Sequence, residues 1–259
     1  MAKRILLFLG MIGLLIIGGC SSNNGQIGKG KKVELTISAA ASLQDALADI
    51  KKEFESKHKN LTLTFNFGAS GALQQQISQG APVDLFFSAA EDKFQQLIKD
   101  GSIAEKDRRN IVGNEIVLIV PKDSSNNIAS FQDLTKANKI SIGTPSSVPA
   151  GMYGKETLEK LQIWKDVENK IVFGKDVRQV LNYVETGNVD AGIVYKTDAL
   201  LSEKVRIIAI AEDSTHSPII YPAGIVKNSK HYQQAKAFFD YLQGNQAMDI
   251  LKKYGFKGL

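Results

Sequence analysis

The chain of 259 residues contains one cysteine, Cys20. A single cysteine cannot form a disulfide within its own chain, so internal cross-links are excluded as a source of stability. Hydrophobic residues make up 43% of the sequence, which is ordinary for a globular protein. We therefore expect a fold that is held together by hydrophobic cores.

Residues that carry catalytic or metal chemistry are also few. The three histidines, His58, His216 and His231, lie in polar stretches without the spacing of a metal site. The sequence has neither the Gly-x-Ser-x-Gly motif of serine hydrolases nor the Gly-x-x-x-x-Gly-Lys-Ser/Thr motif of nucleotide-binding loops. We predict that the protein is not an enzyme and that it uses no cofactor and no metal cation.

The sequence has no large excess of charge of one sign. Its formal net charge is +5. Residues 1–19 contain Lys3 and Arg4 and no acidic residue, so their removal would lower the net charge to +3. Such a balance does not indicate nucleic acid as a partner.

One long apolar run is present, and it lies next to the cysteine. Lys3 and Arg4 precede the run Ile5–Ile17, which is shorter than the roughly 20 residues that span a bilayer. The sequence Gly18-Gly19-Cys20 then resembles a lipoprotein cleavage site, which implies cleavage before Cys20 and lipidation of its thiol. We predict a signal peptide over 1–19, a polar tether over 20–32, and an extracytoplasmic protein that a lipid anchors to the cell membrane.

From Val33 onward, strand-like and helix-like patterns alternate. Val33, Leu35 and Ile37 have the two-residue spacing of a strand, and the next segment has helical spacing with Ser42 as its expected cap. This alternation predicts an α/β protein with parallel sheets and helices on both faces. Segments 116–120 and 219–226 are candidates for a two-strand hinge. The predicted lobes are 33–117 with 223–259, and 118–222.

Several predicted strands end in loops that precede helices and contain small or hydroxyl residues. In parallel α/β sheets, ligands lie at such ends, where helix amide groups lack internal partners and carry partial positive charge. The loops therefore suit an anion. The segments are Ala39–Leu43, Gly68–Gly71, Pro149–Gly151, Asp176–Arg178 and Gly192–Tyr195.

The sequence resembles the molybdate-binding proteins of ABC importers across essentially all of the mature chain. The segments that carry the resemblance are Ala39–Leu43, Gly80–Phe86, Val148–Gly151, Asp176–Arg178, Gly192–Tyr195 and Lys253–Phe256. The resemblance implies a type II periplasmic-binding-protein fold, in which two serines, two backbone amides and a tyrosine hydroxyl hold the ion. The matching positions are Ser42, Ser70, Ala150, Val177 and Tyr195. The run 68–72 departs from the serine-rich run of the family, which loosens the register at Ser70. Molybdate or tungstate is the implied ligand, and a membrane permease and an ATPase are the implied partners of a monomer.

Other interpretations of the same residues stay open. Each serine alone is typical of a helix cap, and Tyr195 alone is typical of a core aromatic. Arg178 could contact the anion, although a structural salt bridge, for example with Asp84 or Asp176, is the more common use of such an arginine. Sulfate or another oxyanion could be the ligand, and a ligand-sensing lipoprotein could share the fold.

Overall fold

The computed structural model of the protein describes residues 32–259. The predicted signal peptide, the lipidation site Cys20 and the tether lie outside the described residues, apart from Lys32. No described helix is long and apolar enough to cross a membrane.

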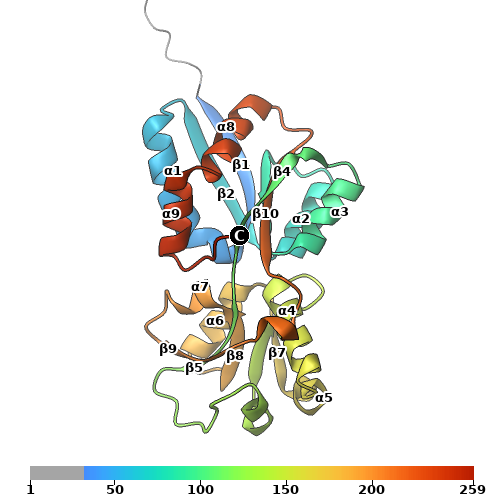
Figure 1. Ribbon diagram of the computed structural model, residues 1–259, viewed down its shortest axis with the longest axis vertical. Coiled ribbons are helices and arrows are strands. Elements are labelled where there is room, and N and C mark those ends of the chain that lie inside the picture. The colour runs from blue at the N-terminus through green and yellow to red at the C-terminus, as the bar shows by residue number, and fades with distance from the viewer. Residues whose placement is uncertain (1–31) are drawn as a thin grey trace, which may run out of the picture. The chain divides into compact units, whose positions relative to one another are not determined.

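Two five-stranded sheets organise the described chain, one in each of two α/β lobes (Figure 1). The first sheet has the strand order β2-β1-β3-β10-β4. Its lobe comprises β1 (Val33–Ala40), the 3-10 turn η1 (Ala41–Leu43), α1 (Gln44–Lys57), β2 (Leu61–Gly68), α2 (Ser70–Ser78), β3 (Leu85–Phe87), α3 (Glu91–Lys99), β4 (Ile103–Gly113), β10 (Ile220–Val226), α8 (Tyr232–Leu242) and α9 (Asn245–Lys253).

The second sheet has the strand order β7-β6-β8-β5-β9. Its lobe comprises β5 (Ile116–Pro121), η2 (Gln132–Lys136), β6 (Ile140–Gly143), α4 (Pro149–Lys160), α5 (Trp164–Val167), η3 (Glu168–Lys170), β7 (Ile171–Gly174), α6 (Val177–Glu185), β8 (Ala191–Tyr195), α7 (Lys196–Ala199), β9 (Val205–Ile210) and η4 (Asp213–Thr215). The strand-helix alternation that the sequence predicts is present in both lobes.

Both sheets are mixed rather than wholly parallel. Strands β1, β2 and β3 are parallel in the first lobe, as are β6, β7 and β8 in the second. Strand β10 is antiparallel to β3, and β5 is antiparallel to β8. The reason is the direction of entry: each of these strands begins where the chain has just crossed from the other lobe, so it runs away from the cleft while the parallel strands run toward it.

The two segments that the sequence suggested as a paired hinge do not pair with each other. Strand β5 bonds to β8 and β9, and β10 bonds to β3 and β4. The chain passes between the sheets at residues 114–115 and 211–219 instead. Ile116 and Val117 therefore lie in the second sheet, although the prediction placed them in the first lobe. Residues 220–222 lie in the first sheet, although the prediction placed them in the second lobe. Each apolar segment is buried within its own sheet, which explains why both lack charged residues.

Candidate functional site

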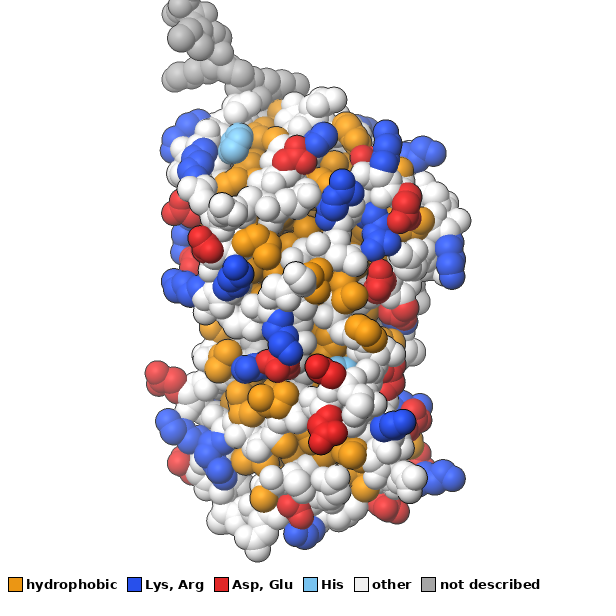
Figure 2. Space-filling view, viewed as in Figure 1, with side chains coloured by type: hydrophobic (Ala, Val, Ile, Leu, Met, Phe, Trp, Pro, Cys, Tyr) orange, Lys and Arg blue, Asp and Glu red, His pale blue; other side chains and the backbone are white. Residues whose placement is uncertain are grey.

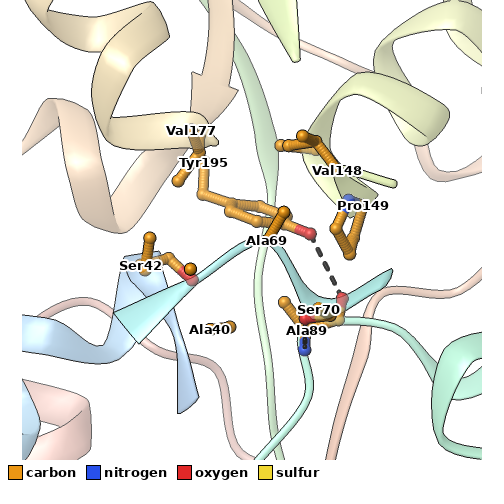
Figure 3. Close-up of a pocket in the computed structure, with 12 residues that line it drawn as sticks. Ala40, Ser42, Ala69, Ser70, Ala89, Val148, Pro149, Val177 and Tyr195 are labelled. Carbon is orange, nitrogen blue, oxygen red and sulfur yellow. Dashed lines mark hydrogen bonds between the residues drawn. The ribbon is translucent and has the colours of Figure 1, made fainter. Parts of the chain in front are cut away.

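A small cavity lies between the lobes, at the ends of strands from both sheets (Figure 3). The space in which the centre of a water molecule can lie is about 10 Å³, roughly the minimum for one water molecule. Such a cavity favours an ion of a few atoms over an organic molecule. The lining residues are Ala40, Ala41, Ser42, Gly68, Ala69, Ser70, Ala89, Val148, Pro149, Ala150, Val177 and Tyr195.

All five residues that the family resemblance implies as ligand contacts line this one cavity. Ser42 and Ser70 come from the first lobe, and Ala150, Val177 and Tyr195 come from the second. Positions separated by more than 150 residues of sequence thus meet around one point.

Three of the residues that line the cavity lie at helix starts. Ser70 and Val177 are the first residues of α2 and α6, and Ala150 is the second residue of α4. Amides in a first helical turn have no partner inside the helix, and among the described residues we find no hydrogen bond from these three. They provide donors with partial positive charge for an anion.

The two serine hydroxyls do not cap the helices beside them. Leu43 is the N-cap of α1 and Ala69 is the N-cap of α2, neither with a side-chain hydrogen bond, so the sequence-based expectation of a Ser42 cap is wrong. The cause is η1, which carries the chain through a tight turn before α1 begins. The hydroxyl of Ser42 instead lies 2.9 Å from the hydroxyl of Tyr221, and Ser70 Oγ accepts a 2.9 Å hydrogen bond from the amide of Ala89.

Tyr195 ends strand β8, and its ring crosses toward the first lobe (Figure 3). Its hydroxyl donates to the carbonyl oxygen of Ala89 at 3.2 Å. Burial raises the pKa of Tyr195 well above its usual range, and the nearby Tyr221 hydroxyl acts in the same direction. The side chain is therefore a neutral hydroxyl that keeps its proton at any physiological pH, and in this structure Ala89 accepts it.

The lining contains no charged side chain. Arg178, the candidate counter-charge, lies outside the lining and forms salt bridges with Asp45 at 2.5 Å and with Asp198 at 2.7 Å. Asp45 is in the first lobe and Asp198 is in the second, so neither acidic residue suggested from the sequence is the partner. Asp176 instead caps α6 by accepting from the amide of Gln179 at 2.8 Å.

Asp84, the other suggested partner, is engaged within the first lobe. Its carboxylate accepts from the amide of Thr36 at 2.8 Å and from Ser229 Oγ at 2.6 Å. The aspartate therefore ties the start of the loop after β10 to β1, on the side of the lobe away from the cavity.

The lobes also touch beside the cavity through glycine. The amide of Gly71 donates to the carbonyl oxygen of Ser147 in the other lobe at 2.9 Å, and a Cβ on Gly71 would lie 2.8 Å from Ser147 Cα. A Cβ on Gly151 would lie 1.9 Å from Gly143 O. These glycines thus permit the contact between the lobes and the packing of α4 on β6.

Two contributors to the site were not predicted from the sequence, Tyr221 and Asn114. Tyr221 lies within an apolar strand, and Asn114 lies in the passage between sheets, so neither stands in a recognisable motif.

Among the described residues, no group of three or more His, Cys, Asp or Glu side chains could hold a metal ion.

Comparison with known proteins gives consistent matches. Residues 35–257 match the family model of bacterial extracellular solute-binding proteins. The chain is 58% identical, over 99% of both chains, to a Bacillus subtilis protein named provisionally as an ABC transporter substrate-binding lipoprotein. It is 35% identical to the molybdate-binding protein of Escherichia coli K12, over 86% of this chain and 88% of that one.

Solved structures agree with the architecture. The substrate-binding domain of a protein assigned provisionally as a molybdenum ABC transporter of Clostridium difficile matches with a TM-score of 0.68 and 41% identity, covering 88% of this chain and 100% of that one. The periplasmic molybdate-binding protein of Azotobacter vinelandii matches in fold, with a TM-score of 0.77 and 24% identity over 86% and 98% of the chains. The predicted type II periplasmic-binding-protein fold is confirmed.

Proposed function

This chain belongs to the family of bacterial extracellular solute-binding proteins, and we propose that it binds molybdate, and also tungstate, between its lobes for delivery to an ABC importer. The observation that carries the proposal is the uncharged cavity, which both lobes line with hydroxyls and helix-start amides. We assign Ser42, Ser70, Ala150, Val177 and Tyr195 as the ligand contacts.

Neutral donors suit a fully ionised oxyanion. Every oxygen of such a dianion can accept a hydrogen bond, whereas hydrogen phosphate keeps a proton that requires an acceptor. Protonated oxyanions would leave a buried donor facing a donor, and an unsatisfied buried donor costs about 1 to 3 kcal/mol. The site therefore selects against phosphate through its hydrogen-bonding pattern.

The choice of molybdate over sulfate rests on relatives rather than on this cavity. Proteins from Escherichia coli and Haemophilus influenzae, both 35% identical to this chain, are named as molybdate-binding. The two ions have the same charge and tetrahedral shape, so their discrimination depends on small differences in size.

Transport follows from the position of the site. An ion that accepts hydrogen bonds from both lobes stabilises the closed arrangement, and a membrane permease with its ATPase can recognise that arrangement. We infer that the protein works as a monomer outside the cytoplasm, held to the membrane through a lipid on Cys20. The Bacillus subtilis relative, named as a lipoprotein, supports this location.

The decisive experiment is calorimetric titration of the purified protein with molybdate, tungstate, sulfate and phosphate at one pH and ionic strength. We expect molybdate and tungstate to bind with one-to-one stoichiometry and far more tightly than sulfate, with no binding of phosphate. Sulfate binding as tightly as molybdate would contradict the molybdate assignment and leave a general oxyanion binder. Absence of binding by all four ions would refute the proposal.

A further inference from the structure

Tyr221 is a fully buried tyrosine of strand β10 that lies directly behind the cavity. Its ring packs edge-on against Tyr195 and Phe256, at centroid distances of 5.6 and 5.4 Å. Its hydroxyl does not line the cavity, but it lies 2.9 Å from Ser42 Oγ, which does. Tyr221 can therefore influence the ligand only through another residue.

The orientation of Asn114 determines what the Tyr221 hydroxyl does. Asn114 Oδ1 accepts a 2.8 Å hydrogen bond from the amide of Glu115, which leaves Nδ2 as the group that faces the other partners. Nδ2 donates to Thr197 Oγ1 at 2.9 Å and to the Tyr221 hydroxyl at 3.0 Å. The oxygen of Tyr221 is thus an acceptor on its Asn114 side.

The proton of Tyr221 then has Ser42 as its acceptor. The phenol carries one proton, and Ser42 Oγ is its hydrogen-bonded partner besides Asn114 among the described residues. Burial raises the pKa of Tyr221 well above its usual range, so this proton is retained. If Ser42 accepts from Tyr221, its own proton is left to point into the cavity.

We propose that Tyr221 is a positioning residue that, together with Asn114, holds Ser42 as a hydrogen-bond donor toward the bound oxyanion. The inference rests on the proposed function, because it needs an anion in the cavity. Successive donation from Asn114 to Tyr221, from Tyr221 to Ser42 and from Ser42 to the anion strengthens each bond through mutual polarisation. It also keeps Ser42 from accepting a proton, which adds to the selection against protonated oxyanions.

The chain of hydrogen bonds from Asn114 through Tyr221 to Ser42, which we call the relay, further connects the ligand to the passage between the lobes. Asn114 lies in that passage, and Thr197 lies in α7 of the second lobe, whereas Ser42 and Tyr221 belong to the first. The hydrogen bond from Asn114 to Thr197 therefore ties the relay to the second lobe in the relative position seen in this structure. An anion that draws on the Ser42 proton favours the same position.

A double-mutant cycle tests the relay. Molybdate affinity is measured by calorimetry for the wild type, Tyr221→Phe, Ser42→Ala and the double variant. We expect Tyr221→Phe to weaken binding about tenfold, the equivalent of one hydrogen bond. In the Ser42→Ala background, the same change should alter affinity by less than about twofold, because the relay has lost its end point.

Controls separate this effect from loss of packing. Tyr153→Phe removes the hydroxyl of another buried tyrosine, which lies outside the cavity lining and donates to Pro218 O at 3.4 Å, and it should leave affinity unchanged. Asn114→Ser interrupts the relay one step earlier and should weaken binding without adding to Tyr221→Phe. Thermal unfolding of each ligand-free variant reports whether the fold is retained.

Three outcomes would overturn the relay while the proposed function stands: unchanged affinity in Tyr221→Phe, equal weakening with and without Ser42, or equal weakening in Tyr153→Phe. If the wild type binds sulfate in place of molybdate, the cycle is run with sulfate, and the relay is judged by the same criteria. A wild type that binds no oxyanion refutes the proposed function and the relay together.

Discussion

Asp198 is a fully buried carboxylate in α7, three residues after Tyr195. Burial raises its pKa to about 7, although the Arg178 guanidinium at 2.7 Å opposes that rise. A carboxylate in this position keeps Arg178 extended toward Asp45 in the other lobe. Its ionisation therefore bears on stability near neutral pH.

We predict that the free energy of unfolding depends on pH through Asp198, and that Asp198→Asn removes this dependence. The folded pKa of about 7 exceeds the ordinary value of 3.8, so the folded state holds a proton that the unfolded chain releases between about pH 4 and 7. The contribution of this group to the free energy of unfolding should fall as pH rises through that window, by about 4 kcal/mol, and level off above it. Urea unfolding of both proteins at several pH values measures the difference. Parallel curves for the two proteins would contradict the assignment.

Individual site residues differ in how far the sequence reveals them. Ser42 and Tyr195 can be suggested from their side chains, because a hydroxyl at a strand end is a recognisable donor. Ala150 and Val177 contribute amides, and an amide is present at every residue except proline, so these two positions followed from family resemblance alone. Tyr221 acts behind another residue, and such an indirect contact leaves no pattern in the sequence.

At the scale of elements, periodicity predicted the central strands and the amphipathic helices. Helix α1 buries Ala46, Leu47, Ile50 and Phe54, and the spacing of these residues by three or four positions is what predicted the helix. Among the edge strands, β2 and β7 were predicted, whereas β4 and β9 were missed. Strand β4 is at one edge of its sheet and contains the charged run 105–109, because an exposed edge tolerates charge and needs little apolar sequence.

The start of α2 supplies an element-scale prediction. Gly71→Ala would place a Cβ 2.8 Å from Ser147 Cα and O across the cleft, so we expect molybdate affinity to fall at least about tenfold. The ligand-free protein should be as stable as the wild type or more so, because alanine is favoured over glycine in helices by about 1 kcal/mol. Calorimetry and thermal unfolding measure the two effects separately.

Gly258→Ala provides the matched control for that variant, since its Cβ would meet no atom within 4 Å. Unchanged affinity in Gly71→Ala would mean that the ion binds without the contact between α2 and the Ser147 loop.

At the scale of the whole molecule, charge is dispersed and closure depends on local contacts. On the face shown in Figure 2, positive and negative side chains are interspersed over both lobes. The ion pair between Arg178 and Asp45 is the contact of opposite charges that joins α6 of one lobe to α1 of the other. It can stabilise the closed form without touching the ligand.

We predict that Asp45→Asn weakens molybdate binding about two- to fivefold at low salt, with a smaller difference at about 1 M salt, where the screening length falls to roughly 3 Å. The effect is modest because the Asp45 side chain is 42% exposed. Asp240→Asn, which breaks the pair with Lys236 within α8, should leave affinity unchanged. A loss of molybdate affinity that does not change with salt would mean that Asp45 acts otherwise than through its ion pair with Arg178.

The crossing segments have a mechanical consequence. Strands β5 and β10 start at the cleft and are hydrogen-bonded to strands on both sides within their sheets. We therefore expect any bending between the lobes to occur at residues 114–115 and 211–219. Asn114 places this pivot two hydrogen bonds away from Ser42. Because the ion lies close to this pivot, a rotation that moves the lobes slightly at the ion displaces their far surfaces by a larger distance. A ligand of only a few atoms can in this way change the surface that the protein presents far from where the ligand sits.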